Sequence, residues 1–236
     1  MLEQPAGPGM PSAEELREAI DSSPGRPLGR GYQAAVTLHQ TPLGALVVKE
    51  AHGWPLLAAA TRRTLRHEAA AYARLAGVPG VPRCHGLLDG RRLVLEHVPG
   101  RSLRQGPVEP EAHQRFFAAL LETLRAMHAA GVAHGDLKRK DNVLIGPGGR
   151  PYVIDFGIAL LRRDNGGRWH RLLFETWRQM DLNAWIKLKH GRRPEQLEGE
   201  DAAIYRPLAI ERAARVLRVT WQKLTFRRLR KRHRTR

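Results

Sequence analysis

Two short motifs and the hairpin predicted between them constrain this chain most. Residues 134–138 read His-Gly-Asp-Leu-Lys, and Asp155-Phe156-Gly157 begins nineteen residues after the first aspartate. Between the motifs, the apolar segments 143–145 and 152–154 are separated by Gly146-Pro147-Gly148-Gly149, a composition typical of a turn. The sequence therefore predicts a strand hairpin that links the two aspartate motifs.

Upstream of the motifs, the residue pattern predicts a small, mostly antiparallel β region with one helix. Two of its strands are joined by a proline-containing and glycine-containing turn at residues 40–44, and two more by Asp89-Gly90. The expected strands cover residues 28–38, 45–49, 86–88 and 92–98, and the expected helix covers residues 61–76. A further short helix should begin at Ser12, because Glu15 follows at the spacing of a capping box.

Downstream, apolar residues recur at helical spacing, and helices are expected over residues 109–130, 166–190 and 202–229. A β region followed by a helical region predicts an α+β fold. The expected division is a flexible N-terminal arm with a short helix (1–26), the β region (27–98), the helical region (99–229) and a basic tail (230–236).

Two features of the β region could bind a phosphate, and a third residue could hold one of them in place. Gly29-Arg30-Gly31, followed by Ala34, would let backbone amides approach an anion, although a plain turn has the same composition. Lys49 ends an apolar strand, where an inward-facing lysine needs an anionic partner. Glu68, in the predicted helix, could supply it. Taken singly, a solvated lysine and a surface glutamate are the better explanations, and the pair gains weight only from the other motifs.

Taken together, the motifs resemble the protein-kinase superfamily over roughly residues 27–190. The resemblance implies a two-lobed fold with a small β-rich N-lobe and a shortened helical C-lobe, and it implies ATP and Mg²⁺ as cofactors. By the same resemblance, Asp136 orients the acceptor hydroxyl and takes its proton, Asp155 binds Mg²⁺, and Lys138 faces the transferred phosphate.

The resemblance also assigns the nucleotide-binding residues. Residues 93–100 are similar to the hinge of kinases, with Leu95 as gatekeeper and the backbone of Glu96 and Val98 receiving adenine. His134 would brace the catalytic loop against the Asp-Phe-Gly turn. The remaining cofactor-binding residues implied are Gly29, Gly31, Ala34, Lys49 and Glu68.

The match departs from the family at the metal-binding asparagine. Asn142 lies six residues after Asp136 instead of five, and Asp141 occupies the fifth position. Either the catalytic loop holds one extra residue and Asn142 is the ligand, or Asp141 takes its place, which a cation that prefers oxygen would accept. The interval to Asp155, about one residue longer than usual, favours the extra residue.

Two further departures concern regulation and substrate docking. Gly135 stands where the family has an arginine that pairs with a phosphorylated activation segment, and no Ala-Pro-Glu signature follows Gly157. Residues 181–185 resemble the anchoring helix behind the catalytic loop. This truncation resembles compact bacterial members: the lipopolysaccharide core-sugar kinases that act on heptose or Kdo, and the RIO-type atypical kinases.

Charge and cysteine content bear on location and partners. The formal net charge is +17, and no acidic residue follows Glu211. A solvated basic helix is the simplest interpretation of this end, contact with anionic lipid ranks next, and nucleic acid ranks last. The single Cys84 excludes an intramolecular disulfide, and no stretch has the length and apolarity of a membrane span. We therefore expect a cytoplasmic protein, with peripheral contact at the inner membrane as an option.

The sequence thus predicts an ATP-dependent kinase whose acceptor is a hydroxyl, first a protein serine or threonine. The alternative acceptor is a lipopolysaccharide core sugar at the inner membrane surface. The second alternative is a catalytically inactive nucleotide-binding scaffold, suggested by the displaced Asn142 and the absent third glycine.

Overall fold

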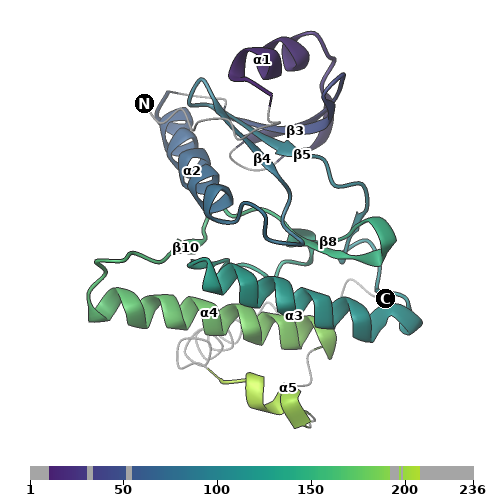
Figure 1. Cartoon of the computed structure of the whole chain (residues 1–236), viewed down its shortest axis with the longest axis vertical. Coiled ribbons are helices and arrows are strands. Elements are labelled where there is room, and N and C mark those ends of the chain that lie inside the picture. The colour runs from purple at the N-terminus through teal and green to yellow at the C-terminus, as the bar shows by residue number, and fades with distance from the viewer. Residues whose placement is uncertain (1–10, 31–33, 52–54, 192–196, 198, 208–236) are drawn as a thin grey trace, which may run out of the picture.

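The computed structural model describes residues 11–30, 34–51, 55–191, 197 and 199–207 (Figure 1). Gly31, residues 1–10 of the predicted arm and residues 208–236, which include the predicted basic tail, lie outside the described residues. The described part is a mixed α+β structure with an antiparallel sheet, which confirms the predicted class. The domain boundaries stay a prediction.

A five-stranded antiparallel sheet forms the upper part of the molecule in Figure 1. Its strands lie in the order β1-β2-β3-β5-β4. They comprise β1 (Arg26–Arg30), β2 (Ala34–Thr41), β3 (Gly44–Ala51), β4 (Cys84–Leu88) and β5 (Arg92–Glu96). The prediction of one strand over residues 28–38 was wrong: β1 ends at Arg30 and pairs back antiparallel onto β2.

Two helices cover opposite faces of this sheet. Along β3, Leu46 and Val48 belong to a buried cluster with Leu16 and Ile20 of α1 (Ala13–Asp21). Alternate residues point to the other face, where Val47 packs against the larger core that includes residues of α2 (Pro55–Arg74). This alternation turns Lys49 towards α2.

Both helices begin at residues that are favoured at helix N-termini. The capping box at the start of α1 is confirmed, because the Ser12 side chain accepts from the Glu15 amide and the Glu15 side chain accepts from the Ser12 amide. Helix α2 begins earlier than predicted, at Pro55, since proline suits the first helical position.

The lower part of Figure 1 is built on two long helices, α3 (His113–Ala129) and α4 (Arg168–Lys189). Above them, β8 (Val143–Ile145) and β9 (Pro151–Val153) form the predicted hairpin, and β6 (Arg101–Ser102) pairs with β8. The chain between the two aspartate motifs therefore folds as the sequence predicted. A second small ladder joins β7 (Val132–Ala133) to β10 (Leu160–Leu161).

The last described helix corrects part of a prediction. Of the helix expected over residues 202–229, residues 208–229 lie outside the described residues, and α5 (Gly199–Ile204) ends before Tyr205. Pro207 supplies the reason, because the residue before a proline is disfavoured in helical geometry and proline cannot donate a helical hydrogen bond. No helix in the described part of the chain is long and apolar enough to cross a membrane.

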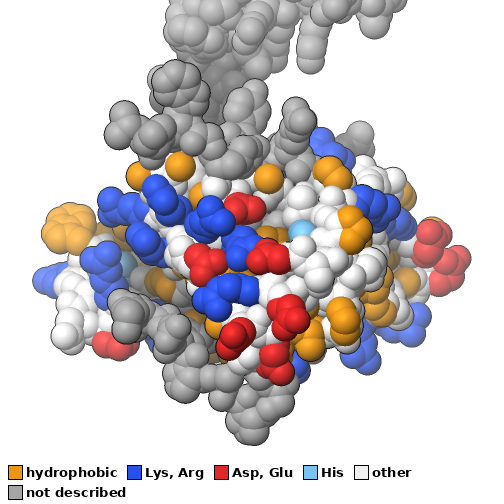
Figure 2. Space-filling view, turned by 90° about the horizontal axis from the view of Figure 1, so that it is seen from above, with side chains coloured by type: hydrophobic (Ala, Val, Ile, Leu, Met, Phe, Trp, Pro, Cys, Tyr) orange, Lys and Arg blue, Asp and Glu red, His pale blue; other side chains and the backbone are white. Residues whose placement is uncertain are grey.

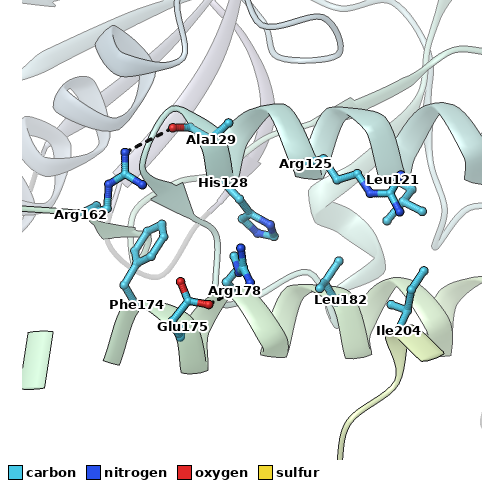
Figure 3. Close-up of a pocket in the computed structure, with 10 residues that line it drawn as sticks. All are labelled: Leu121, Arg125, His128, Ala129, Arg162, Phe174, Glu175, Arg178, Leu182 and Ile204. Atoms are coloured by element: carbon cyan, nitrogen blue, oxygen red, sulfur yellow. Dashed lines mark hydrogen bonds and ion pairs between the residues drawn. The ribbon is translucent and has the colours of Figure 1, made fainter. Parts of the chain in front are cut away.

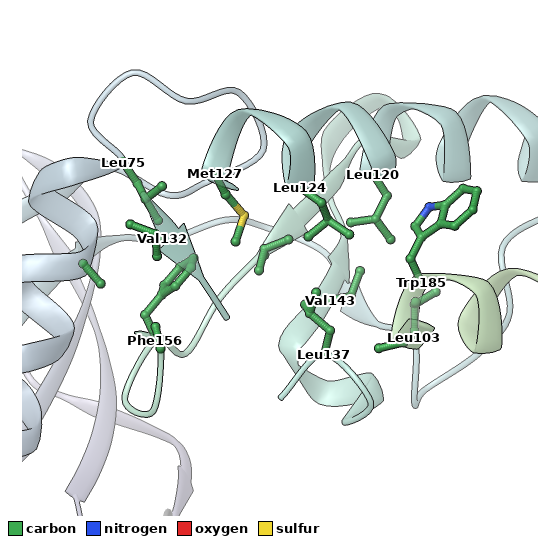
Figure 4. Packing of buried hydrophobic residues seen from close by; sticks show 14 of the residues in the cluster. Leu75, Leu103, Leu120, Leu124, Met127, Val132, Leu137, Val143, Phe156 and Trp185 are labelled. Atoms are coloured by element: carbon green, nitrogen blue, oxygen red, sulfur yellow. The ribbon is translucent and has the colours of Figure 1, made fainter. Parts of the chain in front are cut away.

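The larger hydrophobic core is continuous from α2 to α4. Figure 4 shows Leu120, Leu124 and Met127 pointing from α3 towards the hairpin and catalytic-loop residues, with Trp185 at one end and Phe156 at the other. These side chains are almost completely buried. The core therefore supports the two aspartate motifs from below.

Candidate active site

Lys49 is the point at which three distant segments meet. It lies in β3, opposite Val36 of β2 and Leu93 of β5. Its Nζ donates hydrogen bonds to Oε1 of Glu68 at 2.6 Å and to Oδ1 of Asp155 at 3.1 Å. The Lys49 side chain is only 15% exposed. The ammonium has therefore exchanged most of its water for two carboxylates, as the sequence predicted for an inward-facing lysine.

The positive charge of Lys49 and the negative charges of Glu68 and Asp155 stabilise one another. Burial lowers the pKa of the Lys49 ammonium, but the carboxylates of Glu68 and Asp155 outweigh burial and raise that pKa above its ordinary value. Burial likewise raises the pKa of the Asp155 carboxyl, but the charge and hydrogen bond of Lys49 outweigh it and lower that pKa. Both groups are therefore charged at neutral pH. The stability that Asp155 contributes is lost as pH falls through its lowered pKa.

Glu68 connects α2 to the Asp-Phe-Gly segment. It is 2% exposed, and its Oε1 also accepts a hydrogen bond from the backbone amide of Phe156 at 3.3 Å. Asp155 itself has φ of +71°, a left-handed conformation that residues other than glycine rarely adopt. Contacts on both sides hold this backbone, and such strained positions cluster at functional sites.

A buried cluster of aromatic rings behind Lys49, Glu68 and Asp155 was missed by the sequence reasoning. The Phe156 ring lies 4.9 Å from the Tyr72 ring and 5.0 Å from the His134 ring, measured between centroids. Burial is the main reason why the pKa of Tyr72 lies well above its ordinary value. The available signal was spacing: Tyr72 follows Glu68 by four residues and therefore lies on the same face of α2.

The catalytic-loop segment is held by hydrogen bonds to its backbone. Nδ1 of His134 accepts from the amide of Asp136 at 3.2 Å, so its Nε2 donates to the carbonyl of Ile154 at 3.0 Å. Asp181 of α4 accepts from the amides of His134 at 2.7 Å and Gly135 at 2.8 Å. His134 thus braces the loop as expected, and Asp181 lies behind it as the resemblance implied.

Gly135 is required by the geometry of this loop. Its φ is +77°, and a Cβ at this position would lie 2.6 Å from Nε1 of Trp177 in α4. Both the backbone conformation and the indole therefore exclude a larger side chain. The arginine that the family carries here would not fit this structure.

Asp136 is surrounded by cations. Its side chain is 16% exposed, and Nη1 of Arg139 lies 3.8 Å from its Oδ2. Burial raises the pKa of the Asp136 carboxyl above its ordinary value, although the charges of Lys138 and Arg139 oppose that shift. Lys138 is exposed. A carboxyl whose pKa is raised moves towards the range useful for a general base.

The structure separates the two candidate metal ligands that the sequence left open. Asn142 is 4% exposed, and its Nδ2 donates to the backbone carbonyl of Asp136 at 3.1 Å. The Asp141 side chain is 42% exposed, and its Oδ2 accepts from Nε of Arg104 at 2.6 Å. Asn142 therefore belongs to the buried network of the catalytic loop, whereas Asp141 forms a surface ion pair.

The predicted nucleotide-binding residues lie along the sheet. Gly29 pairs with Val36, which pairs with Lys49, so Gly29 lies in the same row as the lysine two strands away. Ala34 begins β2. Leu95 and Val98 are buried at the end of β5, whereas the Glu96 side chain is exposed and accepts from the amide of Arg83.

The donor set fits a magnesium ion. Asp155 and Asn142 offer the oxygen atoms that this hard cation prefers, and the Asp155 side chain is 47% exposed, which leaves room for phosphate and water ligands. Among the described residues, no three His, Cys, Asp or Glu side chains form a preformed metal cluster. A small number of protein ligands is usual for Mg²⁺.

Known proteins with similar sequences are serine/threonine protein kinases. The chain is 37% identical over 159 residues to CBL-interacting protein kinase 4 of Oryza sativa subsp. japonica, covering 60% of this chain and 34% of the relative. It is 42% identical over 72 residues to the serine/threonine-protein kinase AfsK of Streptomyces coelicolor, covering 28% of this chain and 9% of the relative. A third relative, the serine/threonine-protein kinase cds1 of Schizosaccharomyces pombe, is 32% identical over 96 residues, covering 37% of this chain and 21% of that protein.

No protein-family model matches the chain. The chain spans at most 34% of the length of these three relatives. At modest identity, the relatives support a place in the protein-kinase superfamily and a phosphotransferase with a hydroxyl acceptor. The finer expectations, including the core-sugar and RIO-type likeness, stay predictions.

Proposed function

We propose that this chain is an ATP-dependent kinase that transfers the γ-phosphoryl group to the hydroxyl of a protein serine or threonine. The observation that carries the proposal is the ion-paired cluster of Lys49, Glu68 and Asp155. Three segments far apart in the sequence place a cation and a half-exposed carboxylate together beside Asp136. Such an arrangement suits a nucleotide's phosphates and their metal ion.

Each side chain has a defined role in this proposal. Lys49 holds the phosphates of ATP, and Glu68 keeps Lys49 in place. Asp155 and Asn142 hold Mg²⁺, which when bound offsets the negative charge of the phosphates. The backbones at Gly29 and Ala34 lie over the phosphates, and those of Glu96 and Val98 receive adenine.

The transfer itself needs one base. The acceptor oxygen forms a bond to the γ-phosphorus while the bond from that phosphorus to the β–γ bridging oxygen breaks, and ADP leaves. The hydroxyl proton passes to a carboxylate oxygen of Asp136. Lys138, exposed beside Asp136, faces the phosphoryl group as it moves. The raised pKa of Asp136 improves it as a proton acceptor.

The kind of acceptor is argued from two observations. The relatives are serine/threonine protein kinases, which favours a protein hydroxyl. A lipopolysaccharide core sugar at the inner membrane surface is the alternative. It is favoured by the short connection between Gly157 and α4, only residues 158–167, which offers little surface for docking a peptide. This alternative places the chain on the cytoplasmic side of the inner membrane.

The test is phosphoryl transfer from γ-labelled ATP in the presence of Mg²⁺ and a whole-cell extract, followed by separation into protein and glycolipid fractions. We expect label in the protein fraction, and label in the glycolipid fraction alone would establish the alternative. Asp136→Ala and Lys49→Met should abolish transfer. Arg91→Met is the matched control for Lys49→Met, because Arg91 forms only an exposed ion pair with Glu50 at 3.6 Å.

The inactive-scaffold alternative is decided in the same assay. If the protein binds Mg-ATP but the wild type and Asp136→Ala label neither fraction, the chain is a nucleotide-binding scaffold. If it also fails to bind Mg-ATP, the kinase proposal is wrong altogether. Asp164→Ala, at an exposed position, controls for loss of an acidic residue in Asp136→Ala.

A further inference from the structure

The first two turns of α4 carry an exposed apolar surface. Among the described residues, six large apolar side chains are exposed, and three of them lie here: Trp169 at 84%, Leu172 at 58% and Leu173 at 42%. Their spacing of three and four residues puts them on one side of the helix. Figure 1 shows why α3 does not cover them, since this end of α4 extends past the end of α3. We call these three residues the α4 face.

The next residue of the helix points the other way. Phe174 is 3% exposed, and Figure 3 shows its ring pointing from α4 towards Arg162. The ring centre lies 5.9 Å from the guanidinium carbon of Arg162. Phe174 also lines a hollow between α3 and α4, whose lining includes no residue of the α4 face. The α4 face is therefore an outer surface of the helix end, separate from the core and from this hollow.

Arginines border the α4 face on both edges. Arg168 lies four residues before Leu172 and is exposed, and so is Arg171 in the same turn. At the other edge, the amide of Arg163 donates to Nε2 of His170 at 3.1 Å, which brings a third exposed arginine beside the start of the helix. None of these three guanidinium groups forms an ion pair with a described residue.

Acidic residues do not offset this positive charge. Residues 158–178 include five arginines and two acidic residues, and one of the two, Glu175, is already paired with Nη2 of Arg178 at 2.9 Å. The surroundings of the α4 face therefore attract an anionic partner. A second copy of this chain would bring arginines against arginines. The end of the chain after Glu211, which has no acidic residue, would be repelled in the same way.

The size of the α4 face favours a lipid surface over a protein. Three apolar side chains are few for a stable protein interface, which buries roughly 800 Å² on each partner. A bilayer needs less apolar contact when basic side chains act together with it. Tryptophan is enriched at the boundary between headgroups and acyl chains, and arginines beside it pair with anionic headgroups. The net charge of +17 adds attraction to such a surface.

We propose that the α4 face docks this chain on an anionic lipid bilayer, with its three apolar side chains at the headgroup boundary and the three arginines against the headgroups. This surface is distinct from the basic end of the chain, for which the sequence suggested lipid contact. The same helix carries Asp181, which accepts from the amides of His134 and Gly135. Docking therefore orients the catalytic loop relative to the bilayer.

The contribution of the arginines is measured by sedimentation of the full chain with vesicles, without nucleotide. We expect binding to phosphatidylcholine vesicles that contain phosphatidylglycerol, little binding to phosphatidylcholine alone, and weaker binding at high salt. Arg168→Gln/Arg171→Gln should weaken the binding about fivefold for each arginine removed. Arg63→Gln, at an exposed position of α2, should bind like the wild type.

The apolar contribution has a matched control. Leu173 and Leu43 are both 42% exposed, but Leu43 lies in the turn after β2. Leu173→Ser should weaken vesicle binding about fivefold, because the side chain no longer gains apolar contact at the bilayer. Leu43→Ser should bind like the wild type. Circular dichroism checks that both variants keep their fold.

Contact with the acyl region is read from tryptophan fluorescence. Lipids with brominated acyl chains should quench part of the emission of the bound wild type, and this quenching should be lost in Trp169→Phe. Trp221, in the basic end of the chain, provides the comparison, and Trp221→Phe should keep the quenching. Quenching that is lost in Trp221→Phe but kept in Trp169→Phe would assign the lipid contact to that end and overturn the proposal.

Three other results would also overturn it. The first is binding to anionic vesicles that is unchanged in Leu173→Ser and in the double arginine variant. The second is no binding to anionic vesicles, which would leave an acidic protein as the partner. The third is a dimer in sedimentation equilibrium that Leu172→Ser dissociates, because the α4 face would then contact a second copy of this chain. These measurements involve no phosphoryl transfer, so they remain interpretable if the kinase proposal fails.

Discussion

At the scale of single residues, side-chain hydrogen bonds distinguish the two neighbouring oxygen donors that are candidates for a metal ligand. The side chain of Asn142 is buried and bonded to the Asp136 carbonyl, while Asp141 is exposed and occupied by Arg104. One extra residue in the loop, relative to the kinase motif, accounts for this difference. It moves the asparagine one position later in the sequence, while the asparagine side chain still points into the loop.

The ligand assignment is tested by Asn142→Ala and Asp141→Ala. We expect Asn142→Ala to lower Mg²⁺-dependent phosphoryl transfer on the order of 100-fold, since an oxygen donor and a bond to the catalytic loop are lost together. Asp141→Ala breaks only an exposed ion pair, which contributes about 0.5 kcal/mol or less to stability. Rates are measured over a range of Mg²⁺ concentrations. A larger loss in Asp141→Ala than in Asn142→Ala would reverse the assignment.

The environment of Asp136 predicts the pH dependence of transfer. The base must be ionised, so the rate falls as pH drops through the pKa of Asp136, which burial has raised. Arg139 lowers that pKa, and Arg139→Gln should therefore move the acidic limb of the kcat/KM profile to higher pH. The shift should shrink at high salt, because the Arg139 side chain is 59% exposed. Arg150→Gln, an exposed arginine outside this set of charges, is the control, and equal profiles for the two variants would contradict the prediction.

At the scale of elements, both apolar and charged contacts hold α1 against the sheet. Leu16 and Ile20 pack on Leu46, Val48, Leu88 and Val94. At its edge, Arg17 pairs with Asp89 at 3.0 Å, and Arg92 pairs with Asp21 and Asp89. Figure 2, which looks down on this end of the molecule, shows acidic and basic side chains side by side. The Arg17–Asp89 pair is exposed and adds little, whereas the Arg92 guanidinium is largely buried and holds Asp21 and Asp89 beside the packed face.

The contribution of α1 is measured with Leu16→Ala. This side chain is 1% exposed, and its truncation should lower the free energy of unfolding by about 3 kcal/mol. Leu43→Ala, at a leucine that is 42% exposed in the turn after β2, should cost less than about 0.5 kcal/mol. Urea unfolding followed by circular dichroism gives both values. Similar midpoints for the two variants would mean that α1 does not stabilise the sheet.

At the scale of the whole molecule, Asp181 joins the helical region to the catalytic loop. It is completely buried, and its two oxygens accept from His128, His134 and Gly135. The large hydrophobic core lies beside Asp181. The position of the catalytic loop therefore depends on the packing of α3 against α4. Removal of this carboxylate would leave two buried backbone donors without partners.

Asp181→Asn therefore tests how far the loop depends on the rest of the fold. An amide keeps one accepting oxygen but turns an NH₂ group towards a backbone donor, and we expect a loss of about 3 kcal/mol in stability together with most activity. Thermal unfolding, limited proteolysis and phosphoryl transfer are measured together. Asp164→Asn, at an exposed position, is the matched control. An Asp181→Asn protein with normal melting and normal activity would refute the anchoring role.

The sequence alone predicted the candidate site residues and most of the elements. The aspartate motifs, the hairpin between them and the Lys49 and Glu68 positions were readable because residue type and local periodicity carry that information. The start of α1 was readable because a capping box marks it. The start of α2 at Pro55 and the end of α5 before Pro207 were missed, because these two prolines were not used as helix boundaries.

Which side chains meet depends on the tertiary structure. The Tyr72 ring packs behind Phe156, and the indole of Trp177 lies over Gly135, so each contact joins segments far apart in the sequence. No local pattern encodes such contacts, since they depend on how whole helices pack. The sequence therefore predicted what the site is made of, and the fold determined its geometry.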